Sequence, residues 1–174
     1  GKGLRVLPAD GLDQALALSS RGGIPAQNLL LADASGRIAW TIAGQIPDRG
    51  ERPAGRPIPS SQAGDWRGWL PGERFPRLVD PPVGRLWSAN SRLVDGEFLR
   101  LLGDGGYAFG ARQQRIALRL QGSSSVDYQS LLDIQLDTHN DYLGEWRSLL
   151  TTALEHQAAQ TRPWRDEVSA LLSG

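Results

Sequence analysis

A long proline-rich segment, residues 44–82, limits what this chain can fold into. The segment holds most of the chain's eleven prolines. Because proline lacks a backbone N–H and fixes φ, most of the segment is predicted to be neither helix nor central strand. Irregular segments of this length are uncommon inside a compact domain. Since Trp66 and Trp69 within it need apolar cover, an ordered loop along a large partner surface is favoured over disorder.

Residues 1–49 are predicted to form a strand (3–8), a helix (12–19) and a hairpin (28–32 with 37–43). Asp10 is the expected N-cap of the helix, which carries apolar residues at helical spacing. The hairpin prediction rests on two β-like runs that flank "DASG", in which Gly36 supplies the positive φ of a turn.

Regular structure is predicted to return after the loop and to become helical toward the end of the chain. "RLWSA" (85–89) is apolar enough for a strand. Helices are expected at 111–121, after the serines 123–125 as caps, at 138–160 and from Pro163 onward.

The fold class is therefore α+β, with a β-rich first half and a helical second half. We expect one partial domain, 1–174, in four parts: 1–49, the loop 44–82, a strand and helix at 85–120, and the helices of 124–174.

Composition excludes several classes of function. The chain has 19 Lys and Arg against 19 Asp and Glu, so no excess positive charge favours nucleic acid or an anionic membrane. The absence of cysteine excludes disulfides, thiolate zinc sites and a cysteine nucleophile within these residues. No apolar run approaches the roughly 20 residues that span a bilayer. Neither nucleic acid nor membrane is an expected partner.

No complete catalytic set is visible in the residues themselves. His139 and His156 lack the HExxH spacing of a zinc site and are expected at the surface. The serines 123–125 lack the G-x-S-x-G context of a nucleophile. "GDGGYAFG" (103–110) lacks the flanking strand and helix of a phosphate-binding loop.

Asn90, within "SANSR", permits two interpretations. Asparagine tolerates turn conformations, so Asn90 could simply end the strand before it. Alternatively, its side-chain amide could stabilise the charge on a carbonyl oxygen outside the fold. Arg115 is similarly open, since a solvent-facing helix arginine needs no function.

Five blocks, in order along nearly the whole chain, resemble the penicillin acylase family. They are "IPAQNLLLADASGRIAWTIAGQIPDR" (24–49), "PIPSSQAGDWRGWLP" (57–71), "VDPPVGRLWSANSR" (79–92), "ARQQRI" (111–116) and "LLDIQLDTHN" (131–140). The third block is similar to the family's A-N-N-R motif, and the fourth to its R-a-x-R-I helix. The resemblance places the chain inside the large chain of such an enzyme.

The resemblance implies a four-layer αββα sandwich and the chemistry of an N-terminal-nucleophile amidohydrolase. In this family, self-cleavage of one precursor gives a small and a large chain. A serine at the start of the large chain attacks the amide, and its own α-amine, titrating near ~8, acts as general base. That serine lies outside this chain. Asn90 then falls on the oxyanion donor, and Arg115 on an arginine that supports the catalytic network.

The chain also departs from the family pattern. Ser91 replaces the usual second asparagine, and Asp80 stands where asparagine is common. Some members hold a structural calcium, and the matching loop position is near Ala54, not a proline. The main ligands would lie outside this chain, so the resemblance allows Ca²⁺ only in the complete enzyme. No other cofactor or metal ligand is expected.

The expected function is hydrolysis of an acyl-amine amide, of penicillin type or related, through an acyl-enzyme. The expected partners are the remaining parts of the same precursor and a small-molecule amide. The family implies a periplasmic or secreted location. Two alternatives stay open, an acyl-homoserine-lactone acylase of the same superfamily and a non-catalytic paralogue that only assembles. The isolated chain is expected to be inactive because it lacks the nucleophile.

Overall fold

The computed structural model describes residues 9–50, 57–104, 106–156 and 163–173. The predicted strand 3–8 and the loop position Ala54 lie outside these residues. Contacts between Cα atoms divide the chain into two compact units, residues 1–113 and 114–174. The helices and the small antiparallel sheet confirm the α+β class.

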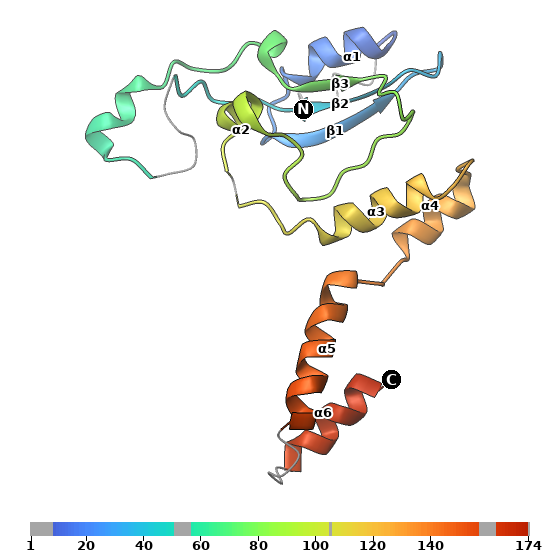
Figure 1. Cartoon of the computed structure of the whole chain (residues 1–174). Helices are drawn as coiled ribbons and strands as arrows, with labels where there is room; N and C mark the ends of the chain where they lie inside the picture. Colours follow the sequence, from blue (N-terminus) through green and yellow to red (C-terminus); the bar gives the residue numbers. More distant parts are fainter. Residues whose placement is uncertain (1–8, 51–56, 105, 157–162, 174) are drawn as a thin grey trace. The chain divides into compact units, whose positions relative to one another are not determined.

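The first unit is built on a three-stranded antiparallel sheet in the order β1-β2-β3 (Figure 1). The strands are β1 (Gln27–Ala32), β2 (Ile38–Ala43) and β3 (Arg77–Val79). The predicted hairpin is confirmed, since β1 and β2 pair from Ala32↔Ile38 to Gln27↔Ala43. Gly36 in its turn has φ 86°, a conformation that glycine adopts without steric cost.

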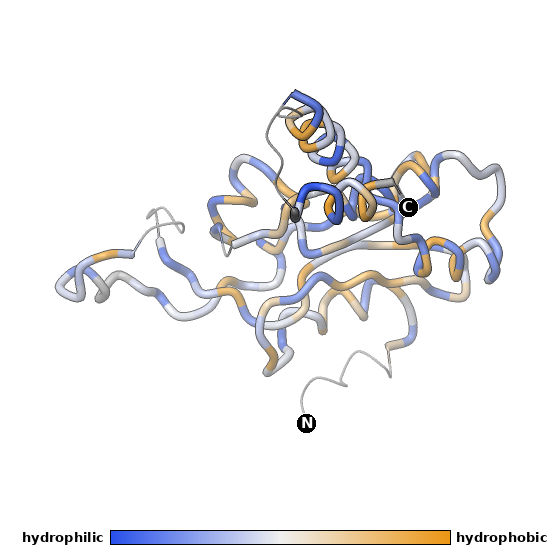
Figure 2. The backbone as a smooth tube through the Cα atoms, turned by 90° about the horizontal axis from the view of Figure 1, so that it is seen from below, coloured by the Kyte–Doolittle hydropathy of each residue, from blue (hydrophilic) through white to orange (hydrophobic). Residues whose placement is uncertain are grey.

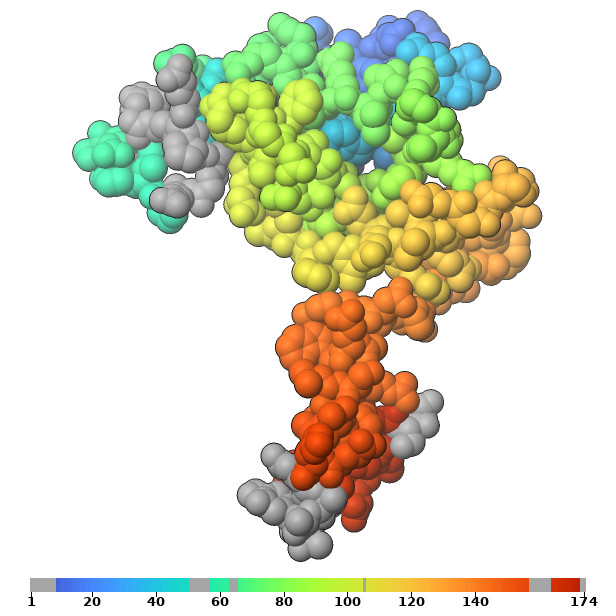
Figure 3. Space-filling model, viewed as in Figure 1, coloured from blue at the N-terminus to red at the C-terminus, as the bar shows by residue number. Residues whose placement is uncertain are grey.

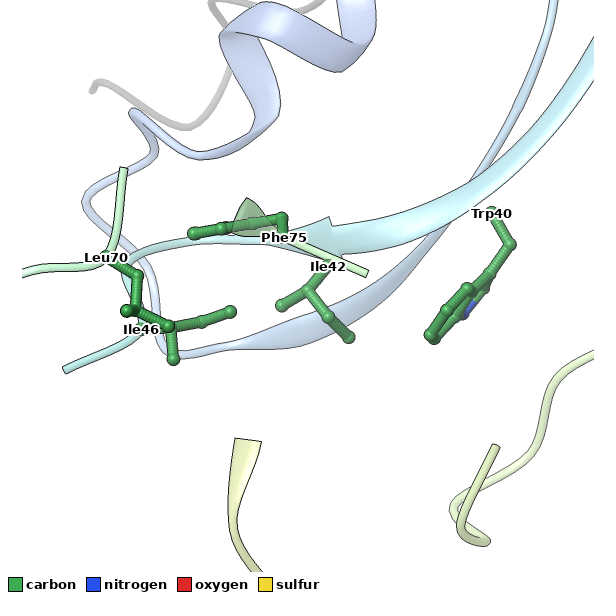
Figure 4. Packing of buried hydrophobic residues seen from close by; sticks show 5 residues of the cluster. All are labelled: Trp40, Ile42, Ile46, Leu70 and Phe75. Atoms are coloured by element: carbon green, nitrogen blue, oxygen red, sulfur yellow. The ribbon is translucent and has the colours of Figure 1, made fainter. Parts of the chain in front are cut away.

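The central strand β2 is buried on both faces. Trp40 and Ile42 pack with Ile46, Leu70 and Phe75 in the larger core cluster (Figure 4). The neighbouring positions of β2 point to the other face, where Ala39 packs with Leu12 and Leu16 of helix α1 (Leu12–Ser19). This double burial explains why "IAWTIA" is almost continuously apolar rather than alternating.

Residues after the loop cover the Trp40 face of the sheet. The partly buried side chains that pack there come from the segment 86–94 and from helix α2 (Gly96–Leu102). In Figure 3 the green and yellow-green atoms of this part of the chain leave only small areas of the blue strands visible. The same segment carries Asn90, so the core of the first unit supports the candidate site.

Two sequence predictions for the first unit are wrong in detail. The N-cap of α1 is Gly11, not Asp10, and the first free N–H of the helix, that of Leu12, donates to Asp33 Oδ2 at 3.2 Å. The carboxylate that caps this helix therefore comes from the hairpin turn, a tertiary contact that local sequence does not reveal.

The predicted strand 85–89 is also wrong, because this described stretch has no strand pairing. The third strand lies earlier, at 77–79, and the chain turns away directly after it. Asp80 has φ 46° and Gly84 φ 64°, and Gly84 N–H donates to Pro81 O at 2.8 Å. The tight turn takes the apolar residues of 85–89 out of the sheet and lets Leu86 pack onto its face.

The proline-rich loop forms two short 3-10 helices, η2 (Ser60–Asp65) and η3 (Gly72–Arg74), and the strand β3. Its expected irregular character is thus confirmed for most of its described residues. Trp66 and Trp69 are 54% and 57% exposed. The guanidinium of Arg49 lies 5.5 Å from the ring centre of Trp66, a cation–π contact. A partner surface for this loop stays a prediction.

The helical part of the chain follows the predicted order. Helix α3 (Ala111–Gln121) starts at the end of the first unit, and α4 (Tyr128–Gln135), α5 (Asp141–His156) and α6 (Pro163–Ser173) follow. Hydrophilic and hydrophobic residues are interspersed in the helical segment that leads to the C-terminus (Figure 2). The predicted serine cap of α4 is wrong, since Asp127 is the N-cap and forms a capping box with Ser130. No helix among the described residues is long and apolar enough to cross a membrane.

Candidate functional site

Asn90 lies in a bend of the first unit and is held at both its backbone and its side chain. Its carbonyl oxygen accepts a hydrogen bond from Ala108 N–H at 2.8 Å. Its side-chain Oδ1 accepts another from Nη2 of Arg112, at 2.5 Å. Ala108 lies just before α3 and Arg112 lies in its first turn, so both the segment that leads into the helix and the helix itself contact the Asn90 bend.

The contact with Arg112 fixes which way the Asn90 amide points. A guanidinium can only donate hydrogen bonds, so the amide oxygen must face Arg112 and the NH₂ group must point elsewhere. The positive charge on the oxygen side also polarises the amide, which strengthens its N–H as a donor. Asn90 is exposed. Its NH₂ group is therefore available to an acceptor that approaches from outside.

Asn90 borders a pocket of about 340 Å³ in the first unit. The pocket is lined by Ala26, Gln27, Asn28, Ile42, Asn90, Ser91, Leu102, Gly103, Gly106 and Tyr107. The volume is within the range of small-molecule sites, which combine apolar walls with a few polar groups. Asn90 is thus an amide donor at the edge of a space that a small molecule could enter.

Asn28 connects this pocket to the sheet. Its Oδ1 accepts a hydrogen bond from the indole N–H of Trp40 at 3.0 Å, and its Nδ2 lies 3.4 Å from the carbonyl oxygen of Ala89. Because an indole nitrogen only donates, the Trp40 contact orients the Asn28 amide. Its NH₂ group then faces the peptide that precedes Asn90.

Ser91 is the second polar residue of the bend and is buried, with 4% of its surface exposed. Its hydroxyl donates to Oε1 of Gln113, at 2.5 Å. The residue that replaces the family's usual asparagine therefore lines the pocket without adding a second amide donor, because its hydroxyl proton is donated to Gln113.

Tyr107 lines the pocket beside Asn90 and donates its hydroxyl to Gly103 O at 3.1 Å. Burial raises the pKa of the Tyr107 phenol, and the nearby Asp104 carboxylate adds to the increase. The phenol is therefore neutral at neutral pH, and its O–H donates within the fold, to Gly103 O.

Arg115, the second predicted site residue, makes its contacts in the second unit. Its Nε lies 2.8 Å from Asp137 Oδ2, and Arg119 lies 3.3 Å from the same oxygen. The Asp137 side chain is 8% exposed. Its pKa is lowered first by the backbone N–H of His139 and next by Arg115. This arrangement ties α3 to the segment that follows α4.

Arg112 was missed by sequence reasoning, although the block "ARQQRI" holds both arginines. The family pattern favoured the arginine beside the isoleucine, and only the structure shows which guanidinium contacts Asn90. The sequence did offer one indication: Arg112 lies in the first turn of the predicted helix 111–121, which is the turn closest to the preceding loop.

The residues set aside from the sequence form no alternative centre. His139 lies on the surface at 2.7 Å from Asp141. In the described parts of the chain, no group of three or more His, Cys, Asp or Glu side chains gathers to hold a metal ion. The described His, Asp and Glu side chains therefore do not by themselves fit a calcium site.

Comparison with known proteins shows which family and which relatives the chain is similar to. The penicillin amidase family model matches residues 2–173. The chain is 31% identical over 134 residues to penicillin acylase 2 proenzyme of Pseudomonas sp. strain SE83, which covers 76% of this chain and 17% of that protein. It is 30% identical over 125 residues to an acyl-homoserine lactone acylase of Pseudomonas fluorescens strain Pf0-1, covering 71% and 15%. The chain spans about one sixth of the length of these relatives.

Proposed function

The chain belongs to the penicillin amidase family, and we propose that it is an internal part of the large chain of an amidohydrolase. The complete enzyme hydrolyses an amide between an acyl group and an amine through an acyl-enzyme. The relatives named as acylases support an acylase-type amidohydrolase. The observation that carries the proposal is the amide of Asn90, which Arg112 orients with its NH₂ group away from the guanidinium.

In the proposed mechanism, Asn90 serves as the oxyanion donor. The nucleophile is a serine at the start of the large chain, outside these residues, with its α-amine as general base. Attack on the amide carbonyl places negative charge on the carbonyl oxygen, and the Asn90 N–H donates to that oxygen. Removing one such donor lowers kcat by roughly 10²–10³.

Arg112 makes this donation effective. It occupies the amide oxygen of Asn90, so the side chain cannot rotate to present that oxygen to the developing oxyanion. An oxygen in that place would repel the charge that the NH₂ group stabilises. A pre-oriented donor also needs no rearrangement at the moment of reaction, which is the condition for a large electrostatic effect.

Arg115 supports the catalytic network only indirectly in this proposal. The contacts that it makes in the described structure, to Asp137 at 2.8 Å and to Asp141 at 3.9 Å, lie within the second unit. We assign it to the stability of the helices that the complete αββα sandwich would contain.

The acyl group is the open variable of the substrate. One relative is named as a penicillin acylase and others as acyl-homoserine lactone acylases, so both substrate classes are candidates. The name proenzyme of the first relative supports maturation from a precursor. A periplasmic or secreted location and assembly with the other parts of that precursor belong to the same proposal.

The test uses the complete protein that contains this chain, assayed with phenylacetyl, penicillin-type and N-acyl-homoserine lactone amides of several chain lengths. Wild-type turnover of one series is expected, and Asn90→Ala should lower kcat by roughly 10²–10³. Asn140→Ala removes another exposed side-chain amide, in the second unit, where Asn140 Oδ1 accepts from Leu143 N–H at the start of α5. This control should keep activity. Absence of turnover of every amide would favour the non-catalytic alternative.

The isolated 174-residue chain provides a second test. Because the proposed nucleophile lies outside it, incubation with a chromogenic phenylacetyl anilide should release no product above the uncatalysed rate. Turnover by the isolated chain would show that another nucleophile is present within these residues.

A further inference from the structure

We infer that Ser91 and Gln113 form a positioning pair that sets the orientation of the Asn90 amide. This inference rests on the proposed function, because it gives the contact between Ser91 and Gln113 the task of placing the oxyanion donor. Neither residue contacts the reacting atoms in this assignment. They act through the adjacent pair, Asn90 and Arg112.

The geometry consists of two neighbouring contacts that run in parallel. Asn90 accepts from Arg112 at 2.5 Å, and the next residue, Ser91, donates to the next helix residue, Gln113, also at 2.5 Å. The backbone of Asn90 adds a third contact through Ala108 N–H at 2.8 Å. Two consecutive bend residues are thus fastened to two consecutive residues in the first turn of α3.

The two side-chain contacts differ in burial, which determines what each can contribute. Asn90 and Arg112 are exposed, whereas Ser91 is 4% exposed and Gln113 is partly buried. An exposed arginine has a long side chain with several rotatable bonds, and holding it in one rotamer costs conformational entropy. The Arg112 contact alone is therefore a weak constraint on the distance between the helix and the bend.

The buried contact supplies the missing constraint. A buried hydroxyl must keep a hydrogen-bond partner, since an unsatisfied one costs roughly 1–3 kcal/mol. Moving the first turn of α3 away from the bend would separate Ser91 from Gln113 and incur that cost. The pair therefore fixes the register between the bend and the helix, and Arg112, one residue before Gln113, is placed within reach of Asn90.

The experiment uses the complete protein with Ser91→Ala, Gln113→Leu and the double variant. Each single variant should lower kcat about tenfold or more with little change in KM, because small displacements of a catalytic group reduce rates strongly. The double variant should lose no more than either single one, since both remove the same contact. Gln113→Glu keeps an acceptor oxygen for the Ser91 hydroxyl. Because consecutive helix residues do not face each other, the new carboxylate should not draw Arg112 away from Asn90, and this variant should retain activity.

Two matched controls separate this effect from a general loss of structure. Ser88→Ala removes another hydroxyl of the same segment, whose contact is the neighbouring Ala89 carbonyl. Gln114→Leu makes the same change as Gln113→Leu at the next position, which is exposed. Both controls should behave like the wild type.

A second readout does not depend on activity. The Ala108 amide donates to Asn90 O, and its hydrogen exchange should become at least several-fold faster in both single variants than in the wild type. Exchange in the double variant should be no faster than in either single variant. Wild-type exchange in Ser91→Ala and Gln113→Leu, or effects of the two changes that add, would overturn the positioning pair. If the complete protein cleaves no amide, the proposed function fails while hydrogen exchange still decides whether this contact holds the bend.

Discussion

Nη2 of Arg112 lies 2.5 Å from Oδ1 of Asn90, and this contact fixes the direction of the only side-chain amide donor proposed for catalysis. Arg115, three residues further along α3, is instead 2.8 Å from Asp137. Arg112 and Arg115, in the same helix, therefore have separate tasks. One orients a polar group at a pocket, and the other joins segments of the helical unit.

Substitution of the two arginines should separate these tasks in the complete protein. Arg112→Leu should lower kcat by about tenfold or more, because the freed amide of Asn90 can rotate and present its oxygen. Arg115→Leu should mainly lower the unfolding midpoint, because it leaves the nearly buried Asp137 with one cation fewer. Steady-state kinetics and thermal unfolding of both variants check this. A larger loss of kcat in Arg115→Leu than in Arg112→Leu would reverse the assignment.

Gly44 is expected to be irreplaceable for steric reasons. It has φ 95°, and a Cβ atom there would lie 2.4 Å from Ile24 O and 2.8 Å from Pro25 O. Both obstacles are backbone atoms that side-chain rotation cannot move. Gly44→Ala should therefore cost about 2–6 kcal/mol of unfolding free energy, the sum of backbone strain and overpacking.

Gly36→Ala is the matched control, since Gly36 has φ 86° but open space around its Cβ position. It should cost only about 1–2 kcal/mol of conformational strain. Denaturant unfolding of both variants isolates the close approach at Gly44, and equal losses would refute it.

Asp80 should make stability depend on pH in the acid range. Its pKa is lowered first by the backbone N–H of Ile38 and then by Arg37, whose Nε lies 3.0 Å away. A carboxyl with a lowered folded-state pKa stabilises the fold fully above its unfolded pKa of about 3.9, and this is lost as pH falls through the folded-state pKa. Asp80→Asn should thus be less stable than wild type at pH 7.

The difference between wild type and Asp80→Asn should shrink as pH falls below about 4, because the wild-type carboxyl then becomes neutral. Urea midpoints at pH 7, 5 and 3 measure it. Asp10→Asn, whose side chain forms no ion pair among the described residues, is the control. A difference that stays constant from pH 7 to 3 would mean that the charge of Asp80 contributes nothing.

Asn28 and Trp40 should be energetically coupled across the hairpin. Asn28→Ala removes the acceptor of the indole N–H at 3.0 Å, and an unsatisfied donor in a partly buried place costs about 1–3 kcal/mol. In a Trp40→Phe background that donor is absent, so the same change should cost less. Unfolding free energies of the four proteins in this double-mutant cycle test the contact, and strict additivity would show that it contributes nothing.

Several features of the fold were predictable because they depend on local chemistry. The hairpin followed from two β-like runs around a glycine that takes positive φ. Helix α6 begins at Pro163, where a proline in the first turn lacks only an N–H that the helix does not use. Pro163 and Gly36 act within a few residues, which is the range that a sequence pattern covers.

Two of the failures, the N-cap of α1 and the strand at 85–89, depend on contacts that form only in the folded chain. Leu12 N–H is capped by Asp33, 21 positions further along the chain. "RLWSA" has the composition of a strand, but the turn at Asp80 and Gly84 carries it across the face of the sheet. In both places a tertiary contact replaces the local preference.

The sequence by itself determined the family, the α+β class and the position of Asn90, because ordered motifs and residue periodicity are properties of the chain in one dimension. The tertiary structure decided which arginine contacts Asn90, in which direction its amide points, and that Ser91 is buried. Those facts depend on how the first turn of α3 meets a bend some 22 residues earlier. Hydrogen-bond directions across such a distance are set by packing, because only the folded chain brings the donor and the acceptor together.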